Sequence, residues 1–302
     1  MQVLANGLQI EVDVQGPAAG PPLLLVMGLG MQLVAWPQEL VDQLVARGFR
    51  VIRFDNRDAG LSQGFETQGM PNMVLAALRY FLRLRVPSPY SLADMALDAV
   101  GVLDALGIAQ AHVCGASMGG MIAQHLAASH PQRVRSLTLI MTSSGSRRLP
   151  QARPAVQRAL LRRPDGRDPD AVVAHLERLL GLIGSPAYPP EPVAFRQRLA
   201  ATVARAWRPA GSARQLLAIV ADGDRTPLLG RIGTPTHVVH GVDDPLVPLP
   251  CGEDLAQRIP GATLDRVPGM GHDLPLPLLP RLADGIAAVA ARAGPAGTLK
   301  PA

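Results

Sequence analysis

Lysine is almost absent from this chain, in which Lys300 is the single lysine and all other Lys/Arg positions are arginine. A net charge of +5 would suit an anionic macromolecule, but aromatic residues make up only 3% of the chain. Proteins that bind nucleic acid along a strand combine a basic groove with aromatic side chains on which bases stack. The scarcity of aromatics therefore predicts no nucleic-acid partner, and the arginine excess indicates a compositional bias with a solvated basic face.

Cysteine, long apolar runs and a signal sequence are also scarce or missing. Cys114 and Cys251 stand in unrelated contexts, which predicts two free thiols in a reducing compartment. No apolar run approaches the roughly 18 residues that a membrane-spanning helix requires. The first residues lack the basic and apolar regions of a signal peptide. We therefore expect a cytoplasmic protein without a membrane span.

Sequence patterns for cofactors and metals are missing too. The segment Gly28-Leu29-Gly30 lacks the third glycine and the distal acid of a dinucleotide-binding loop. Six histidines show no pairing at the spacing of metal ligands, so we interpret each as structural. They are His112, His125, His130, His175, His237 and His240. The sequence predicts no cofactor and no metal.

Apolar runs of strand length alternate with helical patterns along most of the chain. With 48% hydrophobic and 18% charged residues, the 302 residues are enough for one large core. Strands are expected at residues 8–14, 23–27, 50–54, 111–114, 134–141, 236–240 and 262–267, and helices at 38–47, 70–85, 91–106, 249–258 and 276–293. This order predicts an α/β fold, with a mostly parallel central sheet flanked by helices.

The alternation stops between about residues 143 and 229, where the chain is helical in pattern and punctuated by arginine and proline. Because strand and helix units resume afterwards, we expect a helical cap inserted into one core made of residues 1–142 and 230–294. Residues 295–302, rich in glycine and proline, are expected to form a flexible tail. The arginines at 147–167 suit a solvated face of the cap, with attraction of anionic substrates as the alternative.

The apolar helical stripe at residues 70–85 has two interpretations. Apolar side chains at helical spacing are more often core than ligand channel, so we expect this stripe to be core. Its members are Met73, Leu75, Leu78, Phe81, Leu82 and Leu84. The alternative is a roof over a pocket, because the stripe lies between sheet units and the central serine motif.

That motif is Gly115-Ala116-Ser117-Met118-Gly119, which follows an expected buried strand and opens a helix. A bare G-x-S-x-G pattern is weak, but the strand, turn and helix context is that of a nucleophile elbow. The turn is so tight that side chains at Gly115 and Gly119 would collide with neighbouring backbone. We therefore predict that Ser117 is a nucleophile.

A serine nucleophile needs a base that removes its proton and a carboxylate that orients this base. His272 follows the last expected strand, and Asp243 and Asp244 follow the strand at 236–240. Each position lies at the carboxyl edge of a parallel sheet, where open α/β folds bind ligands. The chain order of serine, acid and histidine is that of an α/β-hydrolase triad.

An oxyanion formed by attack of Ser117 also needs hydrogen-bond donors. We expect one from the backbone N–H of Met118, the residue after the nucleophile. The other is expected from the loop after the strand at 23–27, where Leu29 N–H is our choice and Gly28 supports the turn. Both are main-chain donors, so the side chains at these positions need not be special.

These motifs together resemble the α/β-hydrolase fold superfamily over essentially the whole chain, and within it the serine esterases that include aclacinomycin methylesterase. The matching pieces are VMGLG at 26–30, FDNRDAGLS at 54–62, GASMGG at 115–120, HGVDDPLVP at 240–248 and PGMGHDLP at 268–275. The resemblance implies that Asp244, and not Asp243, is the acid. It also implies that Asp55 and Arg57 support the oxyanion loop. One departure is Met27, which stands where the family usually has histidine.

The resemblance implies a cofactor-independent serine carboxylesterase that acts on small-molecule esters with apolar, medium-length or bulky groups. The same triad would also serve lactone hydrolysis, C–C bond hydrolysis or perhydrolysis. A non-catalytic binding protein on this fold is a further alternative, although such proteins usually lack a triad member. Dehalogenases and epoxide hydrolases carry aspartate where Ser117 stands. The sequence does not indicate the oligomeric state.

Overall fold

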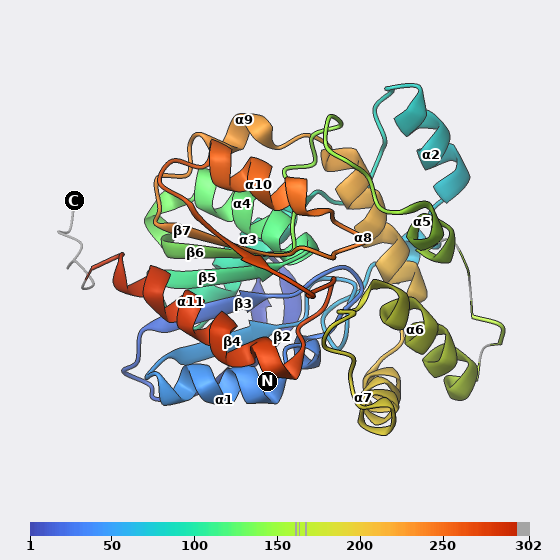
Figure 1. The fold of residues 1–302 in the computed structure, drawn as a ribbon. Helices are drawn as coiled ribbons and strands as arrows, with labels where there is room; N and C mark the ends of the chain where they lie inside the picture. The colour runs from blue at the N-terminus through green and yellow to red at the C-terminus, as the bar shows by residue number, and fades with distance from the viewer. Residues whose placement is uncertain (161, 163, 167, 295–302) are drawn as a thin grey trace.

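A computed structural model of the chain describes residues 1–160, 162, 164–166 and 168–294. Its centre is an eight-stranded sheet with the order β1-β2-β4-β3-β5-β6-β7-β8 (Figure 1). The strands are β1 (Gln2–Ala5), β2 (Leu8–Gln15), β3 (Pro22–Val26), β4 (Arg50–Phe54), β5 (Ala111–Ala116), β6 (Val134–Ile140), β7 (Thr236–Gly241) and β8 (Thr263–Val267). From β4 to β8 all neighbouring strands are parallel, which confirms the expected mostly parallel α/β sheet.

The antiparallel end of the sheet has one strand more than predicted. Strand β2 pairs antiparallel with β4, as the alternating pattern at 8–14 suggests, but it also pairs antiparallel with β1. The edge strand is therefore β1 and not β2. Four residues with a single buried side chain, Ala5, leave too weak a pattern for sequence reasoning to detect.

The central strands are buried on both faces because helices cover the sheet on either side (Figure 1). On one side pack α1 (Gln38–Ala46) and α11 (Leu279–Ala291), and on the other α3 (Leu92–Ala105), α4 (Met118–Ser129) and α10 (Leu249–Arg258). In β3, Leu23 and Leu25 face the first group whereas Leu24 and Val26 face the second. This explains why β3 is a continuous apolar run.

The predicted helix starts and ends mostly agree with the structure. Helix α3 begins with the expected capping box, in which Ser91 Oγ accepts from Asp94 N–H and Asp94 accepts from Ser91 N–H. Helix α11 is shorter than expected, because Leu276–Leu278 form a separate 3-10 turn. Short 3-10 turns at 33–35, 66–68 and 131–133 complete the part of the core that is described.

Between β6 and β7 the described residues form five helices, here called the helical segment (residues 143–229). They are α5 (Pro154–Leu160), α6 (Pro169–Ile183), α7 (Pro192–Arg205), α8 (Pro209–Asp222) and α9 (Thr226–Leu229). Prolines stand at the first turn of α6 to α9, where a missing N–H costs little. The predicted flexible tail at 295–302 lies outside the described residues.

Helix α2 (Met73–Phe81) corrects the expectation that the stripe at 70–85 is core. Within the helix only Ala76 is buried, and 79% of Phe81 is accessible to solvent. The other exposed members of the stripe are Leu75, Leu78, Leu82 and Leu84. Spacing alone cannot distinguish a buried helix from an exposed one when both faces are apolar. The helix lies at the periphery of the molecule, away from the sheet (Figure 1).

Candidate active site

Ser117 occupies the sharp turn between β5 and α4 in a strained backbone conformation, with φ 55° and ψ −119°. A residue with a Cβ adopts such angles only when its surroundings enforce them. Ser117 N–H donates to the Ile140 carbonyl at 2.9 Å, and the Ser117 carbonyl accepts from Thr142 Oγ1 at 2.7 Å. Strand β6 and its following loop therefore hold the turn, and the serine side chain keeps partial contact with solvent.

The two glycines of the turn are required by close packing. A Cβ on Gly115 would lie 2.3 Å from the Gly119 carbonyl oxygen, and one on Gly119 would lie 2.0 Å from the Val26 carbonyl oxygen. Both distances are far below any real carbon–oxygen contact. The elbow therefore forms only because these side chains are absent, as the sequence predicts.

His272 lies between Ser117 and Asp244. Its Nε2 is 2.9 Å from Ser117 Oγ, and its Nδ1 is 2.7 Å from Asp244 Oδ2. If Nδ1–H donates to the carboxylate, the Nε2 lone pair faces the serine hydroxyl and can accept its proton. Asp244 and His272 are 4% and 8% exposed, so water competes little for these two hydrogen bonds.

The neighbouring aspartates have different partners. Asp244 Oδ1 accepts from the N–H groups of Leu246 and Val247, which aims Oδ2 at His272. Asp243 Oδ2 instead accepts from Gly269 N–H at 2.8 Å, in the loop that carries the histidine. The geometry thus favours Asp244 as the orienting acid, while Asp243 fixes the loop.

The histidine loop is also attached to the end of α6 in the helical segment. His272 N–H donates to the Ile183 carbonyl at 2.7 Å, and Gly271 N–H donates to Ser185 Oγ at 2.9 Å. Ser185 Oγ–H donates in turn to the carboxyl group of Asp273. Burial raises the pKa of Asp273 above its ordinary value, although the Ser185 hydrogen bonds oppose this.

The loop after β3 lies against the nucleophile, since a Cβ on Gly28 would be 3.2 Å from the Ser117 Cβ. Gly30 N–H donates to Gln215 Oε1 at 2.7 Å and Met31 N–H to the Gly28 carbonyl at 3.2 Å, so both are engaged. Within the described residues, Leu29 N–H has no protein acceptor. Leu29 is therefore the better candidate for the second oxyanion donor, beside Met118 at the start of α4.

Asn56 anchors this loop where histidine is missing. Its Nδ2 donates to the Met27 carbonyl at 2.9 Å, a bond to the main chain that the methionine side chain does not affect. The buried carboxylate of Asp55 accepts from Leu33 N–H at 2.6 Å and from Leu61 N–H at 2.8 Å. Asp55 thus links Leu33, after the β3 loop, to Leu61 in the loop after β4, and these contacts favour a supporting role.

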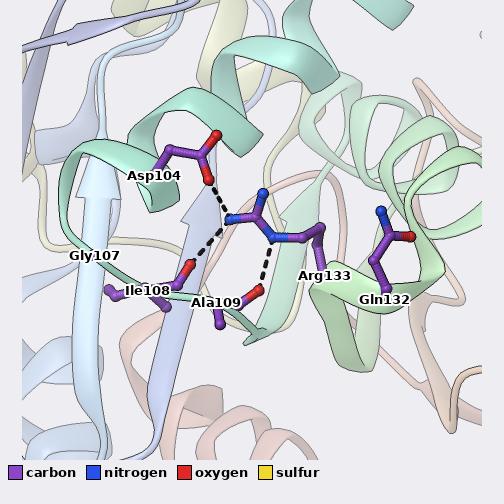
Figure 2. Close-up of a pocket in the computed structure, with 6 residues that line it drawn as sticks. All are labelled: Asp104, Gly107, Ile108, Ala109, Gln132 and Arg133. Carbon is purple, nitrogen blue, oxygen red and sulfur yellow. Dashed lines mark hydrogen bonds and ion pairs between the residues drawn. The ribbon is translucent and has the colours of Figure 1, made fainter. Parts of the chain in front are cut away.

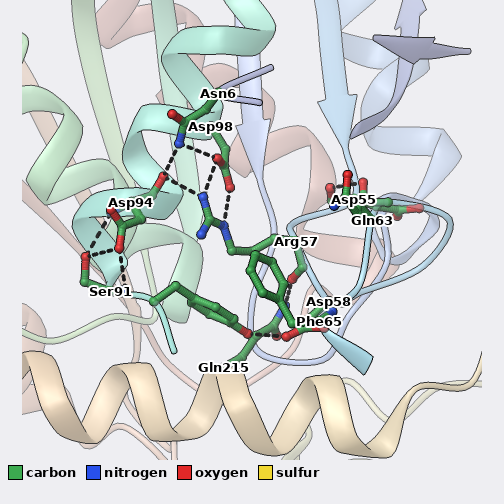
Figure 3. Close-up of polar contacts among 12 residues, drawn as sticks. Asn6, Asp55, Arg57, Asp58, Gln63, Phe65, Ser91, Asp94, Asp98 and Gln215 are labelled. Atoms are coloured by element: carbon green, nitrogen blue, oxygen red, sulfur yellow. Dashed lines mark hydrogen bonds and ion pairs between the residues drawn. The ribbon is translucent and has the colours of Figure 1, made fainter. Parts of the chain in front are cut away.

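Arg57 lies in the same loop as Asp55 and pairs with α3. Its guanidinium pairs with both carboxylate oxygens of Asp98 on α3, at 2.6 Å each (Figure 3). The same guanidinium lies 5.5 Å from the centre of the Phe65 ring and 5.1 Å from that of Tyr90. Burial raises the pKa of Asp98, and the pairing with Arg57 opposes this. Such contacts fit a structural role for Arg57 and not a direct contact with substrate.

Comparison with known proteins identifies the family of the chain. The sequence model described as "alpha/beta hydrolase fold" matches residues 21–277. The chain belongs to the α/β-hydrolase fold family. Rhodomycin D methylesterase DauP of a Streptomyces species is 32% identical over 294 residues, covering 90% of this chain and 92% of the relative.

Solved structures share the α/β-hydrolase fold over nearly the full length. The meta-cleavage product hydrolase CumD of Pseudomonas fluorescens has a TM-score of 0.76 at 20% identity and covers 97% of this chain and 98% of its own. The esterase RhEst1 of a Rhodococcus species has a TM-score of 0.73 at 22% identity, with the same two coverages. At these identities the likeness establishes the fold alone.

Three residues that sequence reasoning missed tie helix α8 of this α/β hydrolase to the site. Arg214 pairs bidentately with Asp58 at 2.8 and 2.7 Å, and both side chains are almost fully buried. Burial would raise the pKa of Asp58, but hydrogen bonds from Arg214, Phe65 N–H and Tyr90 hold it below its ordinary value. Gln215 bridges Gly30 N–H and the Arg57 carbonyl (2.7 Å each).

Other polar groups are not part of the hydrogen-bond chain from Ser117 to Asp244. His240 Nε2 donates to the Val247 carbonyl at 2.7 Å, and burial lowers its pKa, so it packs as a neutral ring beside Asp244. Figure 2 shows a surface pocket around Arg133, whose guanidinium is occupied by Asp104 and the carbonyls of Ile108 and Ala109. This pocket lies at the opposite edge of the sheet, before β5 begins.

Two further features concern the cysteines and the possibility of a membrane-spanning helix. Cys114 and Cys251 are both free and buried, and burial raises the pKa of the Cys251 thiol to about 11. Within the described residues, none of the helices combines the length and apolarity needed to cross a bilayer.

Proposed function

We propose that this α/β hydrolase is a carboxylic ester hydrolase that works through an acyl-enzyme, with Ser117 as nucleophile, His272 as base and Asp244 as orienting acid. The single observation that carries the proposal is the unbroken chain of hydrogen bonds from Ser117 Oγ through His272 to Asp244. It begins at Ser117, a residue that is partly exposed.

The reaction follows from this geometry. Ser117 Oγ attacks the ester carbonyl carbon while its proton passes to His272 Nε2. The oxyanion is stabilised by the N–H groups of Leu29 and Met118, each of which contributes about 3 kcal/mol in such sites. His272 then protonates the leaving alkoxide. Water activated by the same nitrogen releases the acid from Ser117, and no cofactor takes part.

The kind of substrate is supported by the relatives. DauP is named as a methylesterase of rhodomycin D, and its alignment with this chain covers most of both proteins. We therefore assign small-molecule esters with apolar or bulky groups to the chain. The two unpaired thiols are in keeping with the cytoplasm as the place of action.

We assign the role of cap to the helical segment, with residues 1–142 and 230–294 as the core. Support comes from its position between β6 and β7 and from its attachment to both the histidine loop and the oxyanion loop. Through these hydrogen bonds the segment contacts the two loops that carry Gly30 and His272, which supports the assignment.

The decisive experiment compares wild type with Ser117→Ala on p-nitrophenyl esters of graded acyl length. We expect kcat to fall by about four to six orders of magnitude, as in other serine hydrolases that lose the nucleophile. Ser129→Ala, at the exposed end of α4, is the matched control and should retain full activity.

A phosphonate ester probe adds a readout that does not depend on turnover. Mass spectrometry should find one adduct on Ser117 in wild type and none in Ser117→Ala. Ester hydrolysis that persists in Ser117→Ala would overturn the mechanism. A wild type that is labelled but inert on every ester would favour lactone or C–C bond hydrolysis instead.

A further inference from the structure

Exposed apolar side chains are concentrated on one element outside the active site. Of the eighteen large apolar residues that are exposed in the described part of the chain, seven lie between residues 70 and 84. They are Met70, Val74, Leu75, Leu78, Phe81, Leu82 and Leu84. Single exposed apolar residues need no explanation, but a contiguous patch marks a surface that contacts something other than water.

The patch forms because α2 is apolar on opposite faces. Ala76 and the partly buried Tyr80 pack inward, in a small cluster with Val86 and Leu217. Val74, Leu78 and Phe81, spaced by four and three residues, share the outer face. A helix that lies on a protein surface normally has polar residues there. The outer face of α2 is therefore as apolar as a buried surface, yet none of the described residues covers it.

The charges around this face have one sign. Residues 67–93 contain Arg79, Arg83 and Arg85 but no aspartate or glutamate. Residues 143–164, which contain six arginines, also lack acidic residues. The two stretches meet where the Arg147 guanidinium lies 4.1 Å from the centre of the Tyr80 ring and donates to the Tyr80 carbonyl.

Charge decides between the occupants that an apolar face can have. A second copy of the chain, placed face to face on α2, would bring Arg79, Arg83 and Arg85 against the same arginines. Anionic lipid headgroups, in contrast, attract arginine at about the depth at which apolar helix faces enter the acyl-chain boundary. A lipid surface thus satisfies both the apolar and the basic parts of the patch.

We propose that α2 docks this protein on the surface of anionic lipid bilayers. Val74, Leu78 and Phe81 enter the boundary between headgroups and acyl chains, and Arg79, Arg83 and Arg85 lie at headgroup level. This association is peripheral and reversible. It does not depend on the reaction at Ser117, so it can be tested whatever the enzyme hydrolyses.

The test is flotation of the full-length protein with two kinds of vesicle, phosphatidylcholine alone and phosphatidylcholine mixed with phosphatidylglycerol. We expect binding to the mixed vesicles that weakens as salt is added. Leu78→Glu/Phe81→Glu should reduce the partition coefficient by more than about a hundredfold, because two large apolar groups no longer insert. Arg83→Gln/Arg85→Gln should reduce it by about thirtyfold.

The matched control is Val193→Glu, which changes another exposed apolar residue, 63% accessible, at the start of α7. It should bind vesicles like wild type, and equal melting temperatures would show that all variants fold. Three results would overturn the proposal: no binding to the mixed vesicles, equal binding to phosphatidylcholine alone, or unchanged binding by Leu78→Glu/Phe81→Glu. A dimer in sedimentation that this double variant dissociates would assign the face to a second copy and equally overturn it.

Discussion

The two sides of the candidate active site are held in different ways. On the sheet side, Ser117 and Asp244 stand in tight turns stabilised by near neighbours in the chain or by an adjacent strand, whereas the backbone of His272 donates to the Ile183 carbonyl of the helical segment. On the other side, the helical segment is attached through polar contacts between distant residues. Arg214 and Asp58 are 156 residues apart, and Gln215 and Gly30 are 185 residues apart.

This difference separates chemistry from framework. Local turns aim the reacting groups, so that damage there should remove activity and leave the fold intact. The long-range contacts are buried, and one of them is a charge pair in which the loss of either partner leaves the other without compensation. Damage there should lower stability first and activity second.

The strongest test on the sheet side is the pair Asp244→Asn and Asp243→Asn. Asp244→Asn should lower kcat by about 10⁴-fold, because an amide cannot hold His272 in the productive tautomer. Asp243→Asn, which keeps an acceptor for Gly269 N–H, should lose far less. Steady-state kinetics on a p-nitrophenyl ester measures both. If Asp243→Asn were the crippled variant, the assignment of the acid would be wrong by one residue.

The strongest test on the helical side is Arg214→Met, which leaves the Asp58 carboxylate buried without its partner. We expect the free energy of unfolding to fall by about 3–5 kcal/mol in urea titrations. Arg196→Met is the control, since its pairs with Asp170 and Glu177 are exposed and should contribute less than about 1 kcal/mol. Equal losses in the two variants would contradict the distinction between the buried and the exposed pairs.

The sheet side also contains a buried group that makes stability depend on pH. His112 on β5 is 3% exposed and contacts Ser136 Oγ, and burial, aided by Arg135, lowers its pKa to about 4. Its neutral form is thus stabilising above the unfolded pKa of 6.5, and this contribution is lost as the pH falls toward 4.

The loss should amount to about 3 kcal/mol between pH 7 and pH 4. Urea titrations at both pH values, repeated on His112→Gln, measure it as the part of the pH dependence that the variant lacks. A wild type and a variant with the same pH dependence would show that His112 does not make this contribution.

The smallest expected effect joins the two sides. Gln215→Met removes the acceptor for Gly30 N–H and should loosen the oxyanion loop, lowering kcat by about tenfold with little change in KM. Arg208→Ala, which removes an exposed ion pair with Glu66 just before α8, is the control and should be neutral. A rise in KM at constant kcat would instead place Gln215 in substrate binding.

The sequence predicted the parts of this molecule that depend on neighbours in the chain. Gly115 and Gly119 identify the elbow because a tight turn excludes side chains, and the order of the late strands places Asp244 and His272 at the same sheet edge. The resemblance to α/β hydrolases selected Asp244 over Asp243. In the structure Asp244 contacts His272 whereas Asp243 accepts from Gly269 N–H, which favours the same choice.

The rest depended on long-range packing, which leaves no local pattern. Gln215 is one polar residue in an amphipathic helix, and its role appears only when α8 lies against the loop of Gly30. Asn56 stands within a recognised motif, but its bond to Met27 required the fold. For α2 the apolar pattern was detected, yet the prediction that this helix is buried was wrong, because nothing in the described chain covers Val74 or Phe81.

The hydrogen bond between Gln215 and Gly30 has a consequence for protein engineering. Exchange of the helical segment with that of a relative is an obvious route to a new substrate range. In this chain such a graft would also remove an anchor of the oxyanion loop and, through Ile183, a hydrogen-bond acceptor for the backbone of His272. In a successful chimera, the grafted segment therefore has to supply a glutamine that accepts from Gly30 N–H and a helix end that accepts from His272 N–H. Otherwise the chimera has to be selected for catalytic rate before it is selected for a new substrate.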